Sequence, residues 1–122
     1  MCKVKRKIIK RITFEKMVNQ EQIQQLINEI AAGYQPDKIY LFGSYADGTA
    51  TKDSDIDLFI IKETNERWID RNINARSSII NYPYVGMDII VYTPKEFEEA
   101  QLKFMNIGKI AVNTGKLMYE RI

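Results

Sequence analysis

The sequence predicts an α/β fold in which one β-sheet is packed between helices. Helical and strand patterns alternate along the 122 residues, and the strand patterns are short and apolar. The expected strands cover residues 39–42, 55–61, 85–92 and 117–119. The expected helices begin at Asn19, Glu66 and Thr93 and end near Gly33, Asn81 and Gly115, the last one interrupted near 103. This length suits a single compact domain.

Local signals justify these elements in order. Asn19 with Gln22, and Thr93 with Glu96, have the spacing of a helix capping box. The strand expected at 55–61 ends in an uninterrupted apolar run, which predicts that both of its faces are covered there. The first two helices carry apolar residues at helical spacing, which predicts one buried face on each. These residues are Ile23, Leu26, Ile27, Ile30, Ala31 and Tyr34 in the first helix and Ile69, Ile73 and Ile80 in the second.

Charge divides the chain into a basic leader, residues 1–16, and a domain, residues 17–122. The first eleven residues contain six Lys or Arg and no acid, although the whole chain has a formal charge of only +2. The leader is expected to be a solvated end or an edge strand, with contact to nucleic acid or an acidic partner as the alternative. Because the domain itself is mildly acidic, nucleic acid is not expected as a substrate.

Residue types that are missing exclude several kinds of chemistry. The chain has no histidine, which excludes Ser-His-Asp and Cys-His catalysis and zinc bound through imidazole. Cys2 is the only cysteine, so an internal disulfide is impossible. No apolar run approaches the ~20 residues that span a bilayer. We therefore expect a soluble cytoplasmic protein, with no membrane partner, whose chemistry depends on carboxylates.

Two neighbouring segments carry the candidate chemistry. Asp55 and Asp57 are two residues apart on an expected strand, so their carboxylates share one face. Such oxygen ligands suit Mg²⁺ or Mn²⁺. Gly43 and Ser44 follow the preceding strand, where a sharp turn, a hydroxyl and a backbone N–H suit phosphate oxygens. Asp88, at the start of the next strand, is the candidate for a third metal ligand and proton acceptor.

Simpler explanations exist for each part of this pattern. Asp55-x-Asp57 alone is typical of a surface turn, and Asp88 alone of a strand start. A calcium loop starting at Asp53 requires Gly and Glu where the chain has Leu58 and Thr64. A P-loop is excluded because neither Gly-Lys pair is followed by Ser or Thr. The combination is therefore more specific than its parts.

Further residues are candidates for contacts with the substrate. Lys52, between the two motif segments, is a candidate for the phosphates. Arg76 falls on the apolar stripe of the 66–81 helix, so it is expected either to bind an anion or to pack its aliphatic stem on the core. Arg67 and Arg71 are expected to be solvated, with contact to a partner protein as the alternative. Trp68 and Tyr45 are expected either in the core or its rim, or stacked on a base.

The chain resembles the nucleotidyltransferase superfamily that includes DNA polymerase beta in the spacing of its two motif segments. Gly43-Ser44 is followed, after ten residues, by Asp55-Ile56-Asp57, which is the order of that superfamily's signature. The short chain and the continuation Leu58-Phe59-Ile60-Ile61 resemble its minimal nucleotidyltransferase branch. The similarity runs from about Met17 to the end. It implies a mixed sheet flanked by helices, ATP or another nucleoside triphosphate as substrate, and Mg²⁺ held by Asp55, Asp57 and Asp88.

Stand-alone members of this branch resemble antitoxins paired with a HEPN-domain ribonuclease toxin. In such pairs the nucleotidyltransferase adds AMP to a toxin tyrosine and silences the toxin. The resemblance therefore implies a protein adenylyltransferase that forms a hetero-complex with a HEPN toxin. The alternatives are an antitoxin that neutralises its partner only by binding, and a transferase acting on a small molecule such as an antibiotic, which would gain its acceptor site in a homodimer.

Overall fold

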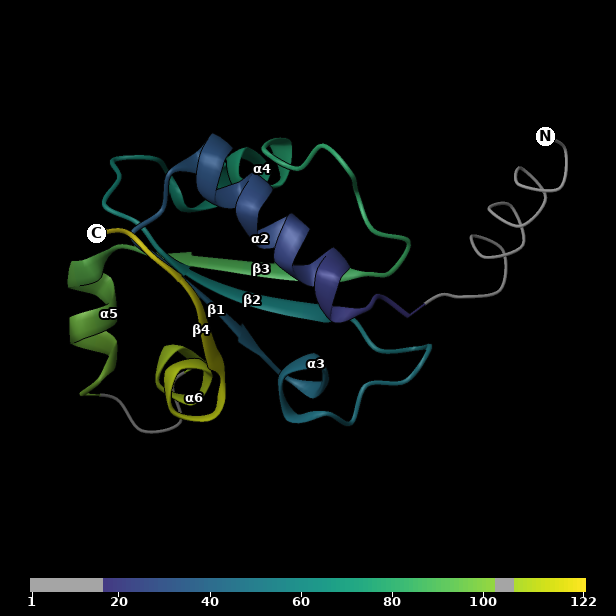
Figure 1. Cartoon of the computed structure of the whole chain (residues 1–122). Coiled ribbons are helices and arrows are strands. Elements are labelled where there is room, and N and C mark those ends of the chain that lie inside the picture. Colours follow the sequence, from purple (N-terminus) through teal and green to yellow (C-terminus); the bar gives the residue numbers. More distant parts are fainter. Residues whose placement is uncertain (1–16, 103–106) are drawn as a thin grey trace, which may run out of the picture.

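The computed structural model describes residues 17–102 and 107–122. Along the chain these form α2 (Gln20–Tyr34), β1 (Lys38–Phe42), α3 (Ser44–Asp47), β2 (Ile56–Ile61), α4 (Trp68–Ser77), β3 (Met87–Tyr92), α5 (Pro94–Ala100), α6 (Ile107–Thr114) and β4 (Lys116–Glu120), as labelled in Figure 1. The basic leader lies outside the described residues, so its expected role stays a prediction.

The four strands form one mixed sheet in the order β3-β2-β1-β4. β1 runs antiparallel to both β2 and β4, whereas β2 and β3 are parallel. β1 therefore ends at the same end of the sheet where β2 and β3 begin, to the right in Figure 1. The α/β fold class with a mixed sheet is confirmed.

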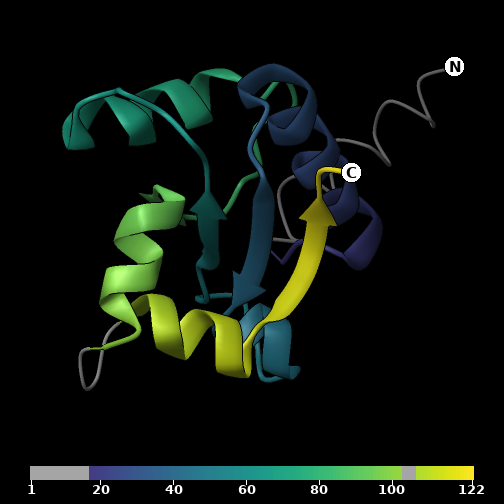
Figure 2. The ribbon, with the colours of Figure 1, turned by 90° about the vertical axis from the view of Figure 1, so that its left-hand side faces the viewer.

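Helices cover both faces of the sheet, which gives three layers (Figures 1 and 2). α2 and α4 cover one face, over the larger core, to which β2 contributes Ile56, Leu58 and Ile60. α5 and α6 cover the other face, over a smaller core that contains Phe59 and Ile61. Because alternate residues of β2 point to opposite faces, the strand is buried on both, as predicted.

Most of the expected helix boundaries are found. Both capping boxes are present, at Asn19–Gln22 and Thr93–Glu96. The first helix does not stop at Gly33, however, but at Gln35, which has left-handed backbone angles. Gly33 has another role: an added Cβ would lie 2.7 Å from the Cβ of Ser78, so this glycine allows α2 to approach the end of α4 closely.

The predicted burial of α4 is wrong. The expected apolar stripe faces outward, with Ile69 at 66%, Ile73 at 57% and Ile80 at 83% exposed, while Arg71 is only 7% exposed. The expectation that Arg71 is solvated is therefore wrong. Its guanidinium donates to Glu96 at 2.6 Å and to the Val91 carbonyl at 3.3 Å. The reason is that α4 packs over the edge of β3, where unpaired backbone carbonyls require hydrogen-bond donors.

No helix in the described part of the chain is long and apolar enough to cross a membrane.

Candidate functional site

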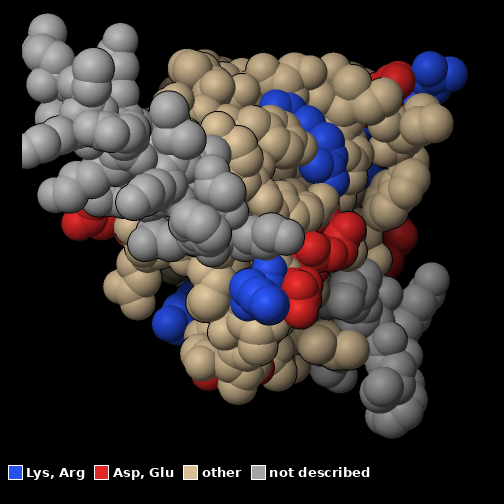
Figure 3. Space-filling view, turned by 90° about the vertical axis from the view of Figure 1, so that its right-hand side faces the viewer, with Lys and Arg blue, Asp and Glu red and all other residues tan. Residues whose placement is uncertain are grey.

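Three aspartates meet where β2 and β3 begin. Asp57 and Asp88 are direct partners in the parallel register of these strands, so both side chains lie on the same face of the sheet. Asp55 precedes the first residue of β2. Seen from this end, acidic side chains gather beside basic ones on the surface (Figure 3). The chain thus brings together three carboxylates that are up to 33 residues apart in the sequence.

The raised pKa of Asp57 indicates that the three carboxylates lie close together. Partial burial raises the pKa of the Asp57 carboxyl to about 6, together with the negative charges of Asp88 and Asp55 and a hydrogen bond with Asp88. A hydrogen bond between two carboxyl groups requires that they share one proton. The Asp57–Asp88 pair is therefore a place where a proton or a cation is favoured and two bare negative charges are not.

Two glycines make room for these carboxylates. A Cβ on Gly43 would overlap the carboxylate of Asp57, and a Cβ on Gly86 would overlap that of Asp55. Gly43 also has a φ of 74°, a backbone conformation that favours glycine. Sequence reasoning missed Gly86 as a residue of the site. The available signal was its position two residues before Asp88, in a segment expected to border the site.

Gly43 and Ser44 lie directly beside the acidic cluster. Phe42, the last residue of β1, pairs with Asp57, and Gly43 then serves as the N-cap of the short helix α3. Ala46 and Asp47 are the first residues of α3 whose N–H groups bond back to Gly43. Ser44, half-buried, therefore begins this short helix directly after the turn beside Asp57, and its contact with phosphate stays a prediction. Lys52 is exposed in the loop that leads from α3 to Asp55.

Comparison with known families decides what kind of domain this is. The family model described as polymerase beta nucleotidyltransferase matches residues 24–121. The chain belongs to that nucleotidyltransferase family. The match includes the whole acidic cluster and the Gly43-Ser44 turn. It supports the minimal nucleotidyltransferase branch and the enzyme class expected from the sequence.

Two individual relatives agree with this family. The chain is 36% identical over 88 residues to a Methanocaldococcus jannaschii protein named "Putative protein adenylyltransferase MJ1305". That match covers 68% of this chain and 58% of the relative's length. A crystal structure described as a "putative nucleotidyltransferase from Sulfolobus solfataricus" shares the fold, with a TM-score of 0.55 and 21% identity over 83% of this chain and 79% of that one.

Two other residues that the sequence suggested for contacts with the substrate have hydrogen-bond partners within the protein. Arg76, on α4, donates to Asn72, to the Tyr82 hydroxyl and to the Met87 carbonyl, at the outer edge of β3. Tyr45 packs against the larger core, and its hydroxyl accepts from the Val18 N–H at 3.4 Å. These contacts give both side chains structural partners. Their direct contact with a nucleotide stays a prediction.

Trp68 lies at the far end of β3, with its ring 5.5 Å from that of Tyr92. It is half-exposed. Asp88 is near the start of the same strand, so the length of β3 separates Trp68 from the acidic cluster. In this structure the Trp68 ring belongs to the rim of the domain.

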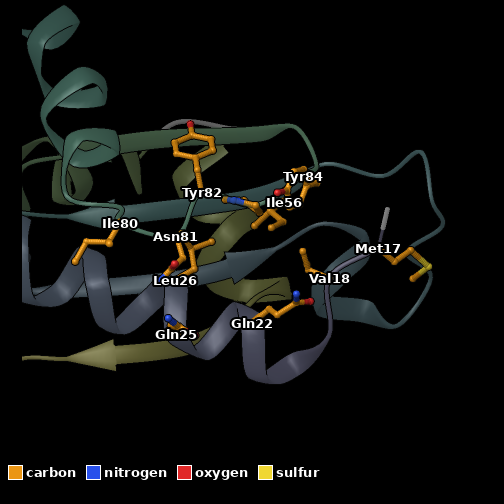
Figure 4. Close-up of a pocket in the computed structure, with 11 residues that line it drawn as sticks. Met17, Val18, Gln22, Gln25, Leu26, Ile56, Ile80, Asn81, Tyr82 and Tyr84 are labelled. Atoms are coloured by element: carbon orange, nitrogen blue, oxygen red, sulfur yellow. The ribbon is translucent and has the colours of Figure 1, made fainter. Parts of the chain in front are cut away.

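A pocket of about 510 Å³ lies on the α2 side of the sheet (Figure 4). Ile56, which faces away from Asp57, forms part of its wall. Several polar groups of the lining are bonded within the protein: Gln22 closes the capping box, and Gln25 and Asn81 both donate to Glu29. This pocket is thus distinct from the acidic cluster, which lies open at the end of the sheet.

The acidic cluster suits a divalent cation by its donor chemistry. Carboxylate oxygens are the ligands that Mg²⁺ and Mn²⁺ prefer, and the Asp57–Asp88 pair favours a positive charge. Within the described residues, no three Cys, His, Asp or Glu side chains are yet arranged to hold a metal ion. Asp55 is exposed directly before β2, two residues before Asp57. The three aspartates are therefore the residues that would hold the ion.

Proposed function

We propose that this nucleotidyltransferase transfers AMP from ATP, with Mg²⁺ or Mn²⁺, to a tyrosine of a HEPN-domain ribonuclease toxin and so acts as its antitoxin. The observation that carries the proposal is the meeting of Asp55, Asp57 and Asp88 beside the Gly43-Ser44 turn. The Methanocaldococcus relative named as a protein adenylyltransferase supports a protein acceptor.

The reaction assigns a role to each part of this site. The tyrosine oxygen bonds to the α-phosphorus of ATP while the bond from that phosphorus to the bridging oxygen breaks, and pyrophosphate leaves. The hydroxyl proton passes to a carboxylate, for which Asp88 is the candidate. Gly43 and Ser44 would bind the triphosphate. Bound Mg²⁺ would neutralise charge on the phosphates and stabilise the attacking and leaving oxygens.

The outer surface of α4 supports a protein partner. Ile69 and Ile73 of α4 are exposed, and so are Ile80, Tyr82 and Tyr84 in the segment that follows the helix. Exposed large apolar side chains that gather in one region of a soluble protein often mark a site where another protein docks. The 78–86 segment leads from this surface to Gly86 and the acidic cluster. A partner bound on the end of α4 and on this segment would therefore lie next to the site.

Transfer of labelled AMP from ATP to the co-purified HEPN protein tests the proposal. Wild type is expected to label one tyrosine of the partner. The double variant Asp55→Asn, Asp57→Asn is expected to lose at least about a hundredfold of the rate, because both metal ligands are removed. Asp53→Asn is the matched control, since Asp53 is an exposed acid of the same loop outside the cluster. Equal labelling by wild type and the double variant would contradict the proposal.

The apolar surface of α4 also favours a second candidate, an antitoxin that neutralises its partner by binding alone. Cell growth in the presence of the toxin separates the two. If the double aspartate variant protects cells as well as wild type does, neutralisation depends on binding. If protection is lost while the complex still forms, neutralisation depends on AMP transfer.

A further inference from the structure

Among the strands of the described residues, β3 lies at one edge of the sheet, so half of its backbone groups face away from β2. Gly86 and Tyr92 direct their carbonyls toward β2, where each accepts a hydrogen bond at 2.9 Å from Ile56 and Lys62. Alternation along the strand then turns the carbonyls of Met87, Ile89 and Val91 outward. An edge of this kind is left unpaired unless another part of the protein supplies donors.

Three polar side chains of α4 supply a donor to each of these outward carbonyls. Arg76 donates to Met87, Asn72 donates to Ile89 at 2.5 Å, and Arg71 donates to Val91 at 3.3 Å. α4 thus lies along the edge of β3 and bonds to every second residue of the strand.

Two of these side chains act as a unit. Arg76 and Asn72 are four residues apart, on one face of α4, and Arg76 Nε donates to Asn72 Oδ1 at 2.5 Å. The two terminal NH₂ groups of the Arg76 guanidinium donate to the Tyr82 hydroxyl and to the Met87 carbonyl. The guanidinium is therefore held in one orientation by three partners, as its planar fork of donors allows.

Asp88 lies between the two backbone carbonyls that this unit holds. We infer that Arg76 and Asn72 are positioning residues for Asp88: by bonding the carbonyls of Met87 and Ile89, they keep the edge strand in place and hold the Asp88 carboxylate against Asp57. The inference rests on the proposed function, in which Asp88 binds the metal and accepts the proton. It assigns to Arg76 a role that acts through the backbone of β3 instead of through a phosphate.

The test is the affinity of the protein for Mn²⁺ alone, measured from the electron paramagnetic resonance signal of free Mn²⁺. Arg76→Met keeps the aliphatic stem and removes all the donors, and Asn72→Ala removes the bond to Ile89. Each is expected to weaken Mn²⁺ binding about tenfold, as the loss of groups that orient metal ligands commonly does. Arg67→Met is the matched control, because Arg67 is an exposed arginine beside α4 whose side chain bonds to Asp70.

AMP transfer gives a second readout. In Arg76→Met, kcat is expected to fall with little change in the KM for ATP, since the triphosphate contacts are untouched. Arg76→Lys retains one donor for Met87 and is expected to recover part of the Mn²⁺ affinity. Asn72→Ala, which leaves Arg76 in place, carries the test if Arg76→Met does not fold.

The outcomes separate this inference from the proposed function. If Asp88→Asn abolishes Mn²⁺ binding while folded Arg76→Met and Asn72→Ala bind Mn²⁺ as wild type does, the inference is wrong and the proposed function stands. A lower melting temperature with unchanged Mn²⁺ affinity also overturns the inference, because the contacts would then stabilise the fold without positioning Asp88. If Asp88→Asn and wild type bind Mn²⁺ equally, the proposed site is wrong and the inference falls with it.

Discussion

Replacing Asp57 by asparagine should make the metal-free protein more stable above neutral pH while removing its activity. Asp57 is partly buried and lies beside two other carboxylates, so ionisation of its carboxyl group lowers the stability of the folded protein. Asparagine has nearly the same shape and no charge. The substitution therefore removes repulsion with Asp88 and Asp55 without opening a cavity.

The sign and the size follow from the pKa of Asp57, which rises from 3.8 to about 6 on folding. Because the folded state binds the proton more tightly, it holds more protons than the unfolded state between these values, and stability falls as the pH rises through that window. The full shift corresponds to about 3 kcal/mol, and solvent screening at a half-buried site reduces it to roughly 1–2 kcal/mol. Below about pH 4 the difference between wild type and Asp57→Asn should almost vanish.

Urea unfolding followed by circular dichroism, in EDTA at about pH 4 and pH 8, measures this difference in the free energy of unfolding. Saturating Mg²⁺ should then stabilise wild type and leave Asp57→Asn unchanged, because a ligand that binds only the folded state adds to stability. Asp53→Asn should stay within about 0.5 kcal/mol of wild type at both pH values. If Asp57→Asn is no more stable than wild type at about pH 8 in EDTA, the three carboxylates do not repel one another as the structure implies.

Three further substitutions test the contacts described above. Gly43→Ala should cost about 1–3 kcal/mol in urea unfolding and lower AMP transfer, because the new Cβ is strained at positive φ and overlaps the Asp57 carboxylate; wild-type stability would contradict this geometry. Arg71→Met should cost about 2–4 kcal/mol by the same assay, since it leaves Glu96 without its cationic partner and the Val91 carbonyl without this donor; a neutral effect would show that the ion pair is dispensable. Ile73→Ser should change stability by less than about 0.5 kcal/mol, because Ile73 is exposed. A loss of several kcal/mol would show instead that Ile73 is buried in the core.

The sequence predicted the parts of this protein that depend on neighbouring residues. The capping boxes at Asn19 and Thr93 act within one helical turn, and both are present. The apolar run of β2 implied a strand covered on both faces, and Phe59 and Ile60 are buried on opposite faces. Local spacing also placed Asp55 and Asp57 at the start of that strand. Each of these features is decided over a few residues, where backbone geometry leaves little choice.

Tertiary contacts decided what local spacing could not. The carboxylate of Asp88 reaches Asp57 only because β3 pairs with β2 in parallel, residue 88 against residue 57. The need for Gly86 appears only once Asp55 lies over it.

The burial of α4 shows most clearly what residue spacing alone does not predict. Its spacing of isoleucines predicted an apolar buried face, yet the helix turns Arg71, Asn72 and Arg76 inward. The spacing of residues shows which of them share a face of a helix. Whether that face is buried, and whether it must be apolar or polar, depends on the surface that it packs against. Here that surface is the edge of β3, a row of backbone carbonyls that hydrogen-bond donors satisfy and isoleucine cannot.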